Sequence, residues 1–161
     1  MQIIKITQVN DVLAEMVALF RVELRSYKGI TSKPNIDAGQ EEMEEYLAAG
    51  FPVFAAIIDG VYAGYVVCRV DGNVVWVESI FVKEEYRRRG VASALHSKAE
   101  EIAASYGEET VYNYVHPNNH HMIDFLRKRG YTVLNLIEIR KPYKGEKLSQ
   151  TIQVGEHEFD Y

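Results

Sequence analysis

Residues 74–107 read VVWVESIFVKEEYRRRGVASALHSKAEEIAASYG, and the rest of the chain is organised around them. Positions 74–82 are mostly β-branched or aromatic, and Asp71-Gly72-Asn73 turns the chain just before them, so they predict a buried strand. Apolar residues then recur at helical spacing from Val91 to Tyr106, and Gly107 is placed to end that helix. The stretch therefore predicts a strand, a short turn and a helix.

The turn between this strand and helix is rich in groups that bind anions. It runs Arg87-Arg88-Arg89-Gly90-Val91-Ala92. Backbone N–H groups at the start of a helix attract anions, and a glycine lets a ligand approach the backbone closely. Guanidinium groups add bidentate contacts to phosphate oxygens. The turn therefore predicts a pyrophosphate-binding site.

Composition limits the class of protein. The chain has 161 residues, of which 47% are hydrophobic and 25% charged, as in an ordinary globular protein, and we expect one domain over 1–161. Its net charge of -5 argues against a general nucleic-acid binder. The single cysteine excludes an intrachain disulfide and fits a reducing cytoplasm. No apolar run could span a membrane and the start does not resemble a signal peptide, so we expect a cytoplasmic protein without a membrane partner.

The remaining elements form one mixed pattern. Asp59-Gly60 predicts a tight two-residue hairpin, and Asp37 followed by Gln40 resembles a capping box that opens a helix. Strands are expected at 2–7, 51–58, 61–70, 74–82, 110–115, 131–139 and 151–159, and helices at 10–27, 37–47, 91–106 and 120–129. Because a helix lies between the strands at 74–82 and 110–115, we expect these two strands to be parallel and joined by a crossover connection. The fold class is α/β (an α+β mixed sheet), mostly antiparallel with one parallel pair and flanked by about four helices.

Three short patterns resemble one known family. Arg87-x-x-Gly90-x-Ala92 is similar to the Q/R-x-x-G-x-G/A motif of the GNAT superfamily of N-acetyltransferases, and Ile80-x-Val82 before it resembles that family's fourth strand. Asn119, followed by FLRKRGY at 125–131, resembles the family's next helix. The order of elements from 51 to 139 also fits. The resemblance implies a GNAT-like fold whose parallel pair lies at the cofactor site.

The family likeness also implies a co-substrate and the residues that bind it. In such proteins the backbone of the fourth strand hydrogen-bonds the pantetheine arm of acetyl-CoA, and the following turn holds the pyrophosphate. The implied cofactor-binding residues are Ile80, Phe81, Val82, Arg87, Arg88, Arg89, Gly90, Val91, Ala92, Ser93 and Asn119. A splayed gap between the strands ending at Val82 and Val115 would let an amine reach the thioester. The implied partner is an amine-bearing small molecule, a protein N-terminus or a lysine, and a homodimer is left open.

One position departs from the family pattern. Members commonly carry a tyrosine, thought to protonate the leaving thiolate, where this chain has Leu126. Leucine cannot donate a proton, so Tyr112, Tyr114, Tyr131 or solvent would do so, or the thiolate would leave unprotonated. A thiol with a pKa of roughly 8.5 is a good enough leaving group to make an acid dispensable.

Glu78 is the candidate catalytic base. By strand parity we expect it on the same face as Trp76, Ile80 and Val82. A carboxylate there, acting through a water, could take the proton that an acceptor ammonium must lose before attack. The alternative is a strand glutamate that pairs with a neighbouring basic side chain. Both interpretations stay open.

Several other polar residues have a structural interpretation. We expect Cys68 to be a small core residue and His96 to lie solvated on the polar side of its helix. His120 and His121 begin a helix and lack a third ligand, so no metal site is predicted. The glutamates at 41–45 are expected to be a solvated acidic face, with attraction of cationic substrates as the alternative.

Two functions remain after these considerations. The first is an acetyltransferase that moves acetyl from acetyl-CoA to a primary amine by direct attack in a ternary complex. The second is a non-catalytic, acyl-CoA-binding regulatory module, which Leu126 keeps open. A dinucleotide-binding domain is disfavoured because no G-x-G-x-x-G follows a first strand. Release of CoA with and without amines would separate the first two.

Overall fold

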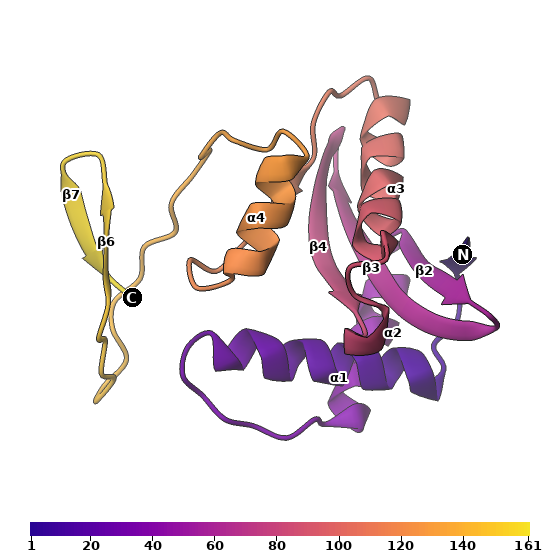
Figure 1. Cartoon of the computed structure of the whole chain (residues 1–161), viewed down its shortest axis with the longest axis horizontal. Coiled ribbons are helices and arrows are strands. Elements are labelled where there is room, and N and C mark those ends of the chain that lie inside the picture. Colours follow the sequence, from indigo (N-terminus) through magenta and orange to yellow (C-terminus); the bar gives the residue numbers. More distant parts are fainter. The chain divides into compact units, whose positions relative to one another are not determined.

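The computed structural model describes residues 1–161, with helices and strands mixed along the chain (Figure 1). The elements are β1 (Gln2–Ile6), α1 (Asp11–Ser26), α2 (Ile36–Ala48), β2 (Val53–Ile58), β3 (Val61–Asp71), β4 (Val74–Val82), the short 3-10 helix η1 (Glu84–Tyr86), α3 (Val91–Ser105), β5 (Tyr112–Asn113), α4 (His120–Lys128), β6 (Thr151–Val154) and β7 (His157–Asp160). The chain divides into two compact units, 1–125 and 126–161.

The first unit contains a five-stranded sheet in the order β1-β2-β3-β4-β5. Its first three pairs are antiparallel, and β4 pairs with β5 in parallel. The parallel pair follows from α3, which carries the chain back to the starting end of β4. The expected mixed sheet with one parallel pair is confirmed.

Local turn chemistry sets the register of the meander. Asp59 and Gly60 have φ values of 51° and 81°, which is the geometry of a type I′ turn. Val61 therefore pairs directly with Ile58, as predicted. The second turn, at Gly72, brings Val74 opposite Asp71 at the start of β4.

The two faces of this sheet pack against different helices. Helices α1 and α2 cover one face, where the core residues are Ile6, Leu13, Met16, Val17, Met43, Val53, Ala55, Tyr65, Val67 and Phe81. Helix α3 packs on β2, β3 and β4 from the other face, and lies alongside β4 in Figure 1. Its buried stripe includes Val91, Leu95 and Ala99. A sheet covered on both faces explains why β3 is buried along most of its length.

Asparagines rather than an aspartate begin the first two helices. The Asn10 side chain accepts a hydrogen bond from Leu13 N and caps α1, as the expected helix start required. At α2 the expected cap at Asp37 is wrong, because the Asn35 side chain accepts from Ala38 N at 3.0 Å and the helix already begins at Ile36. Asp37 lies in the first turn, where its negative charge interacts favourably with the helix dipole.

In the second unit, β6 and β7 form a two-stranded hairpin across Gly155, so the single strand predicted over 151–159 is wrong. The strand predicted over 131–139 is also wrong. That segment has the alternation of a strand, but no strand pairs with it, and Val133, Leu136 and Ile139 are exposed. Alternating apolar residues indicate which side chains could share a face. A strand also needs a neighbouring strand for its backbone hydrogen bonds, and this segment has none.

Candidate active site

A β-bulge on β4 changes the strand at Glu78. Val77 pairs with Cys68 of β3, and Ser79 pairs with Val67, the next residue back along β3. Glu78 is therefore the extra residue that has no partner on β3. Bulges of this kind bend a strand and interrupt its hydrogen-bond ladder locally.

The bulge also corrects the expected parity of the strand. Phe81 pairs with Tyr65, and both belong to the core beneath α1 and α2. Ile80 pairs with Val66 and therefore points to the opposite face, with Val82. Trp76 pairs with Arg69, four positions after Tyr65, and so lies on the α1–α2 face. The expectation that Glu78 and Trp76 share a face with Ile80 and Val82 is therefore wrong, because the extra residue reverses the alternation. Glu78 and Trp76 both contact Arg69 on the α1–α2 face.

Beyond the bulge, β4 has one unpaired edge. Its ladder to β5 consists of Trp76 with Tyr112 and Val77 with Asn113, so β5 is shorter than the expected strand over 110–115. Residues 79–82 pair with β3 on one side only, and Glu78 pairs with neither neighbouring strand. This unpaired edge, which we call the open edge, presents backbone N–H and C=O groups that an extended ligand with amide groups can bind as if it were a strand.

The turn after the open edge has the geometry of an anion site. Gly90 has a φ of 80° and precedes α3, and no side chain caps that helix. The first N–H groups of an α-helix lack intrahelical partners, so those of Val91, Ala92 and Ser93 are oriented to receive an anion. A Cβ built on Gly90 would meet no atom within 4 Å, which leaves room for a ligand. Arg88 is left-handed as well, with a φ of 61°. These features fit a pyrophosphate.

The three arginines of the turn differ in their contacts. Arg87 donates from Nε to the Val82 carbonyl at 2.9 Å and from Nη2 to Glu23 Oε2 at 2.8 Å. Its guanidinium therefore holds the turn against β4 and α1. Arg88 and Arg89 are exposed, and the Arg89 guanidinium lies 5.4 Å from the centre of the Tyr86 ring. Arg88 and Arg89 thus lack the contacts to β4 and α1 that hold Arg87.

Glu78 has a cationic neighbour. Its Oε2 lies 3.2 Å from Arg69 Nε, and its side chain is 29% exposed. The same guanidinium stacks over Trp76 at 4.5 Å from the ring centre. The structure thus supplies the basic partner that the structural interpretation required. It also leaves Glu78 partly accessible at the point where β4 and β5 part.

A groove of about 410 Å³ lies between α1 and the end of β4. Its lining is mixed, with apolar walls and charged ends: Glu15, Leu19, Val22, Glu23, Ser26, Phe81, Lys83, Glu84, Glu85 and Arg87. Figure 1 shows α1 crossing close to the carboxyl end of β4, beside η1. The groove therefore adjoins both the open edge and the turn.

The loop between β5 and α4 contains the predicted residue Asn119 and contacts Tyr27 through residues that sequence spacing did not indicate. Asn119 accepts from Met122 N at 3.1 Å and so caps α4. Its neighbour Asn118 donates to the backbone carbonyl of Tyr27 at 2.8 Å. The Tyr27 ring stacks on His116, with centroids 6.2 Å apart. Tyr27 and Asn118 lie 91 positions apart along the chain, so no local motif could relate them.

Two buried polar groups support β4 and β5 from within the core. Tyr65 Oη and Ser79 Oγ lie 2.7 Å apart. His96 is fully buried, so its expected place on a solvated side of α3 is wrong. Its Nε2 lies 3.2 Å from Asn113 Oδ1, and its ring meets the edge of Phe125. The buried side of α3 is wide enough to take His96 beside Leu95, and the polar tip finds a partner on β5.

Other expected residues take ordinary structural places. Cys68 is buried as predicted, and burial raises the pKa of its thiol to about 12. Leu126 is 7% exposed. No group of three or more His, Cys, Asp or Glu side chains could hold a metal ion. No helix is long and apolar enough to cross a bilayer.

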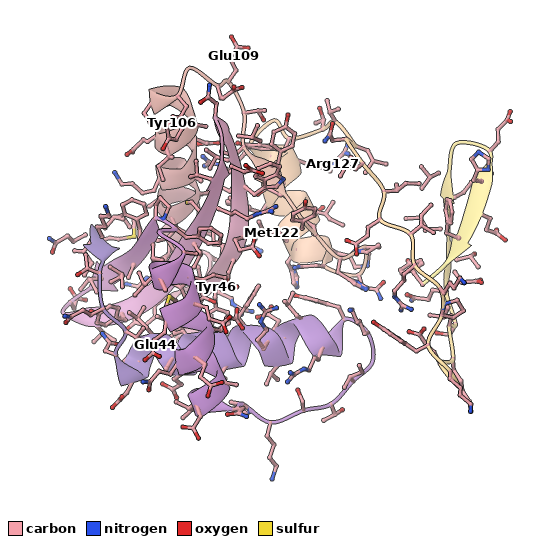
Figure 2. The ribbon with its side chains drawn as sticks, turned by 180° about the vertical axis from the view of Figure 1, so that it is seen from behind. Glu44, Tyr46, Tyr106, Glu109, Met122 and Arg127 are labelled. Carbon is pink, nitrogen blue, oxygen red and sulfur yellow. The ribbon has the colours of Figure 1, made fainter.

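The acidic helix α2 has one side chain turned to the core side. Glu42 pairs with Arg21 and accepts from the Tyr46 hydroxyl at 2.6 Å. Glu44 binds Gln40 on the exposed surface. Figure 2 labels Glu44 and Tyr46 on this helix, and Met122 and Arg127 on α4. The acidic residues of α2 are thus mainly a solvated face, with Glu42 as the exception.

Comparison with known proteins gives relatives for this arrangement. The chain is 28% identical over 114 residues to an N-alpha-acetyltransferase of Saccharolobus solfataricus, covering 61% of this chain and 65% of the relative. It is 30% identical over 113 residues to an N-alpha-acetyltransferase of Sulfurisphaera tokodaii, covering 60% of this chain and 64% of that one. The matched region thus spans slightly less than two thirds of either relative.

A solved structure extends the likeness to nearly the whole fold. The structure of AAC(6')-Iy in complex with a bisubstrate analogue built on CoA superposes with a TM-score of 0.62 at 25% identity, covering 88% of this chain and 98% of that one. Residues 16–131 match the model of the acetyltransferase (GNAT) family, and they include the bulge, the open edge and the turn. The chain therefore belongs to the acetyltransferase (GNAT) family.

Proposed function

We propose that this protein is an N-acetyltransferase that transfers acetyl from acetyl-CoA to a primary amine by direct attack in a ternary complex. The observation that carries the proposal is the open edge of β4 directly before an uncapped helix N-terminus. A co-substrate with an amide-bearing arm and a pyrophosphate needs these two features side by side. The family match over residues 16–131 supports the same activity.

The proposed cofactor contacts follow the chain from strand to helix. Backbone groups of Ile80, Phe81 and Val82 bind the arm along the open edge. Arg88, Arg89 and the backbone from Gly90 to Ser93 hold the pyrophosphate, and Arg87 keeps this turn in place through Val82 and Glu23. Asn119, which caps α4, is the proposed contact on the far wall of the gap. Acetyl-CoA would supply an acyl thioester open to attack by an amine.

Glu78 is the proposed base of the reaction. It occupies the bulge, where the pairing of β4 with β5 ends and the open edge begins. Its partly exposed carboxylate can take a proton from an incoming ammonium through a water. Arg69 stays beside it and holds the side chain on the α1–α2 face. Proton removal is needed because only the neutral amine carries a lone pair for attack.

The leaving thiolate needs no dedicated acid in this proposal. Leu126 is buried and cannot donate a proton. A thiol with a pKa of roughly 8.5 leaves readily as the thiolate, and solvent can protonate it afterwards. Leu126 also keeps a second function under consideration, a regulatory module that binds acyl-CoA without turnover.

The proposed acceptor is a primary amine on a small molecule, a protein N-terminus or a lysine. The similar proteins are N-alpha-acetyltransferases and the aminoglycoside acetyltransferase AAC(6')-Iy. The groove beside the open edge carries Glu15, Glu23, Glu84 and Glu85, which favours a cationic ligand. We propose the cytoplasm as the site of action, since Cys68 is a free thiol.

Release of CoA tests the proposal directly. Purified protein is incubated with acetyl-CoA and a panel of aminoglycosides, polyamines and peptides with free N-termini. We expect release above the hydrolysis background with at least one amine, and an acetylated product by mass spectrometry. Tight binding of acetyl-CoA without release for any amine would contradict the enzyme and favour the regulatory module.

A further inference from the structure

The end of β4 and the β5–α4 loop form the two walls of the gap between β4 and β5. Beyond the pair of Val77 and Asn113, no backbone pairing connects these walls. Something else must therefore fix how far the end of β4 lies from the β5–α4 loop. Reacting groups in an active site need placement to within a fraction of an ångström, and a misplacement of about 1 Å can cost on the order of a hundredfold in rate. The width of this gap is thus a quantity that the fold has to control.

A chain of side-chain contacts crosses the mouth of the gap by way of α1. Glu23 is its centre, because its two carboxylate oxygens have different donors. Oε2 accepts from Arg87 Nη2 at 2.8 Å, and Oε1 accepts from the Tyr27 hydroxyl at 3.0 Å. Arg87 in turn donates to the Val82 carbonyl at 2.9 Å, at the last residue of β4. One wall of the gap is therefore tied to α1.

The other wall is tied to the same helix end. The Tyr27 carbonyl accepts from Asn118 Nδ2 at 2.8 Å, and the Tyr27 ring stacks on His116 at an interplanar angle of 16°. Asn118 N also donates to His116 Nδ1 at 3.1 Å, which keeps the ring and the loop together. Tyr27 thus joins the β5–α4 loop through both its backbone and its ring.

The pKa of Tyr27 favours a hydrogen bond to Glu23 that persists at neutral pH. Burial, followed by the charge of Glu23, raises the pKa of its phenol to about 12. The hydroxyl is therefore protonated at neutral pH and donates to Glu23. Burial, followed by the charge of Lys28, lowers the pKa of His116, which favours the neutral ring that can accept from Asn118.

We propose that Glu23 and Tyr27 are positioning residues that set the width of the β4–β5 gap by connecting Arg87 on one wall with Asn118 on the other. The inference rests on the proposed function, since a gap width matters for turnover only if the gap holds the thioester. We call the chain Arg87–Glu23–Tyr27–Asn118 the brace. It touches no reacting atom and acts through the walls that it joins.

The brace is expected to affect rate far more than stability. The Glu23–Arg87 pair is about a third exposed, and exposed ion pairs typically contribute about 0–1 kcal/mol to folding. A loosened gap, in contrast, lowers the fraction of complexes in which amine and thioester meet. We expect Glu23→Gln and Asn118→Ala each to lower kcat about ten- to hundredfold with little change in the unfolding midpoint.

A double-variant cycle tests whether the contacts act as one unit. Glu23 and Asn118 share no contact and are connected through Tyr27. If the brace is one unit, Glu23→Gln with Asn118→Ala should lower kcat little further than either change alone. Effects that multiply would overturn the proposal. Glu101→Gln, which breaks an exposed pair with Lys98 on α3, is the matched control and should leave kcat unchanged.

A distance measurement tests the brace without any turnover. Cysteines introduced at the exposed positions Glu85 and His121 can carry spin labels on the two walls, while Cys68 stays buried. We expect one narrow label distance in the parent and in Glu101→Gln, and a broader distribution in Glu23→Gln and in Tyr27→Phe. Equal widths in all four proteins would overturn the brace. If the four distance distributions are as expected but the parent turns over no amine, the proposed function is contradicted and the brace is not.

Discussion

The two halves of β4 differ in how many strands they pair with. In the first half, Val74 to Val77, the strand pairs with β3 throughout and also with β5 at Trp76 and Val77, and its buried side chains pack under α3. From Ser79 to Val82 it pairs with β3 alone, and Glu78 pairs with neither neighbouring strand. Backbone N–H and C=O groups need hydrogen-bond partners. The second half therefore keeps unpaired groups that a ligand can bind, whereas β5 already pairs with the end of the first half. The bulge at Glu78 marks the change from scaffold to site.

The comparison predicts that changes in the two halves have separable effects. A change in the paired half should lower the free energy of unfolding and leave ligand affinity alone. A change at or beyond the bulge should alter turnover or affinity and leave unfolding nearly unchanged.

Glu78→Gln should produce the largest loss. The change keeps the shape of the side chain but removes the proton acceptor, and general-base assistance is typically worth about 10²–10⁴-fold in rate. We expect kcat to fall by about a hundredfold near neutral pH while the Kd for CoA changes little. The loss should shrink as pH rises, because solvent then supplies more neutral amine. Steady-state rates across pH, with calorimetry for CoA, measure both quantities.

A pH–rate profile of Glu78→Gln with the parent's height and shape would show that Glu78 acts only as the partner of Arg69. Glu101→Gln is again the control, because it makes the same chemical change on an exposed helix face.

Gly90→Glu should abolish most of the affinity for CoA. A side chain would enter the space above the turn, add a negative charge beside the pyrophosphate and strain a left-handed backbone. We expect the Kd for CoA to rise by about a hundredfold, which corresponds to about 2.7 kcal/mol. Gly107→Glu is the matched control, because Gly107 has a φ of 82° at the other end of α3. A folded Gly90→Glu protein with the parent's affinity would contradict the assignment of the turn.

Val77→Ala tests the paired half of the strand. Val77 is 5% exposed and lies between Cys68 and Asn113. Removal of two methyl groups from this core should lower the unfolding free energy by about 2 kcal/mol. Calorimetry on the folded protein should return the parent's Kd for CoA. A loss of affinity as large as that of Gly90→Glu would mean that the two halves are not separable.

Leu126→Tyr should have the smallest effect. It restores the side chain that the family commonly carries, yet amine deprotonation or attack, rather than departure of the thiolate, is expected to limit the rate. We expect kcat to change by less than about tenfold, below the usual range for general-acid assistance. Pre-steady-state and steady-state rates at several pH values measure it. A rise of about a hundredfold would show that thiolate protonation limits the parent.

Sequence reasoning succeeded where the signal is local. The Asp59-Gly60 turn, the β4–turn–α3 unit and the start of α1 at Asn10 each depend on contacts within a few residues. It failed at 131–139, where alternation suggested a strand but no partner strand exists. It also failed at the cap of α2, since two nearby residues, Asn35 and Asp37, carry equally suitable side chains.

The motif of the candidate site could be recognised in the sequence, but the geometry around it could not. The turn from Arg87 to Ser93 follows from its composition, since glycine, arginines and a helix start suffice to suggest an anion site. The bulge at Glu78 depends on how β3 and β4 align, which no single strand encodes. The contact of Arg87 with Glu23 joins residues 64 positions apart. Long-range pairs of this kind come from packing and leave no spacing to recognise.

Amide hydrogen exchange with and without CoA tests the central claim most directly, because it compares the two halves of β4 in one experiment. Residues 78–82 and the first turn of α3 should become protected when CoA binds, since their free backbone groups gain partners. Trp76 and Val77, already paired on both sides, should exchange at the same slow rate in both states. Protection confined to some other surface, with no change at the open edge, would contradict the account.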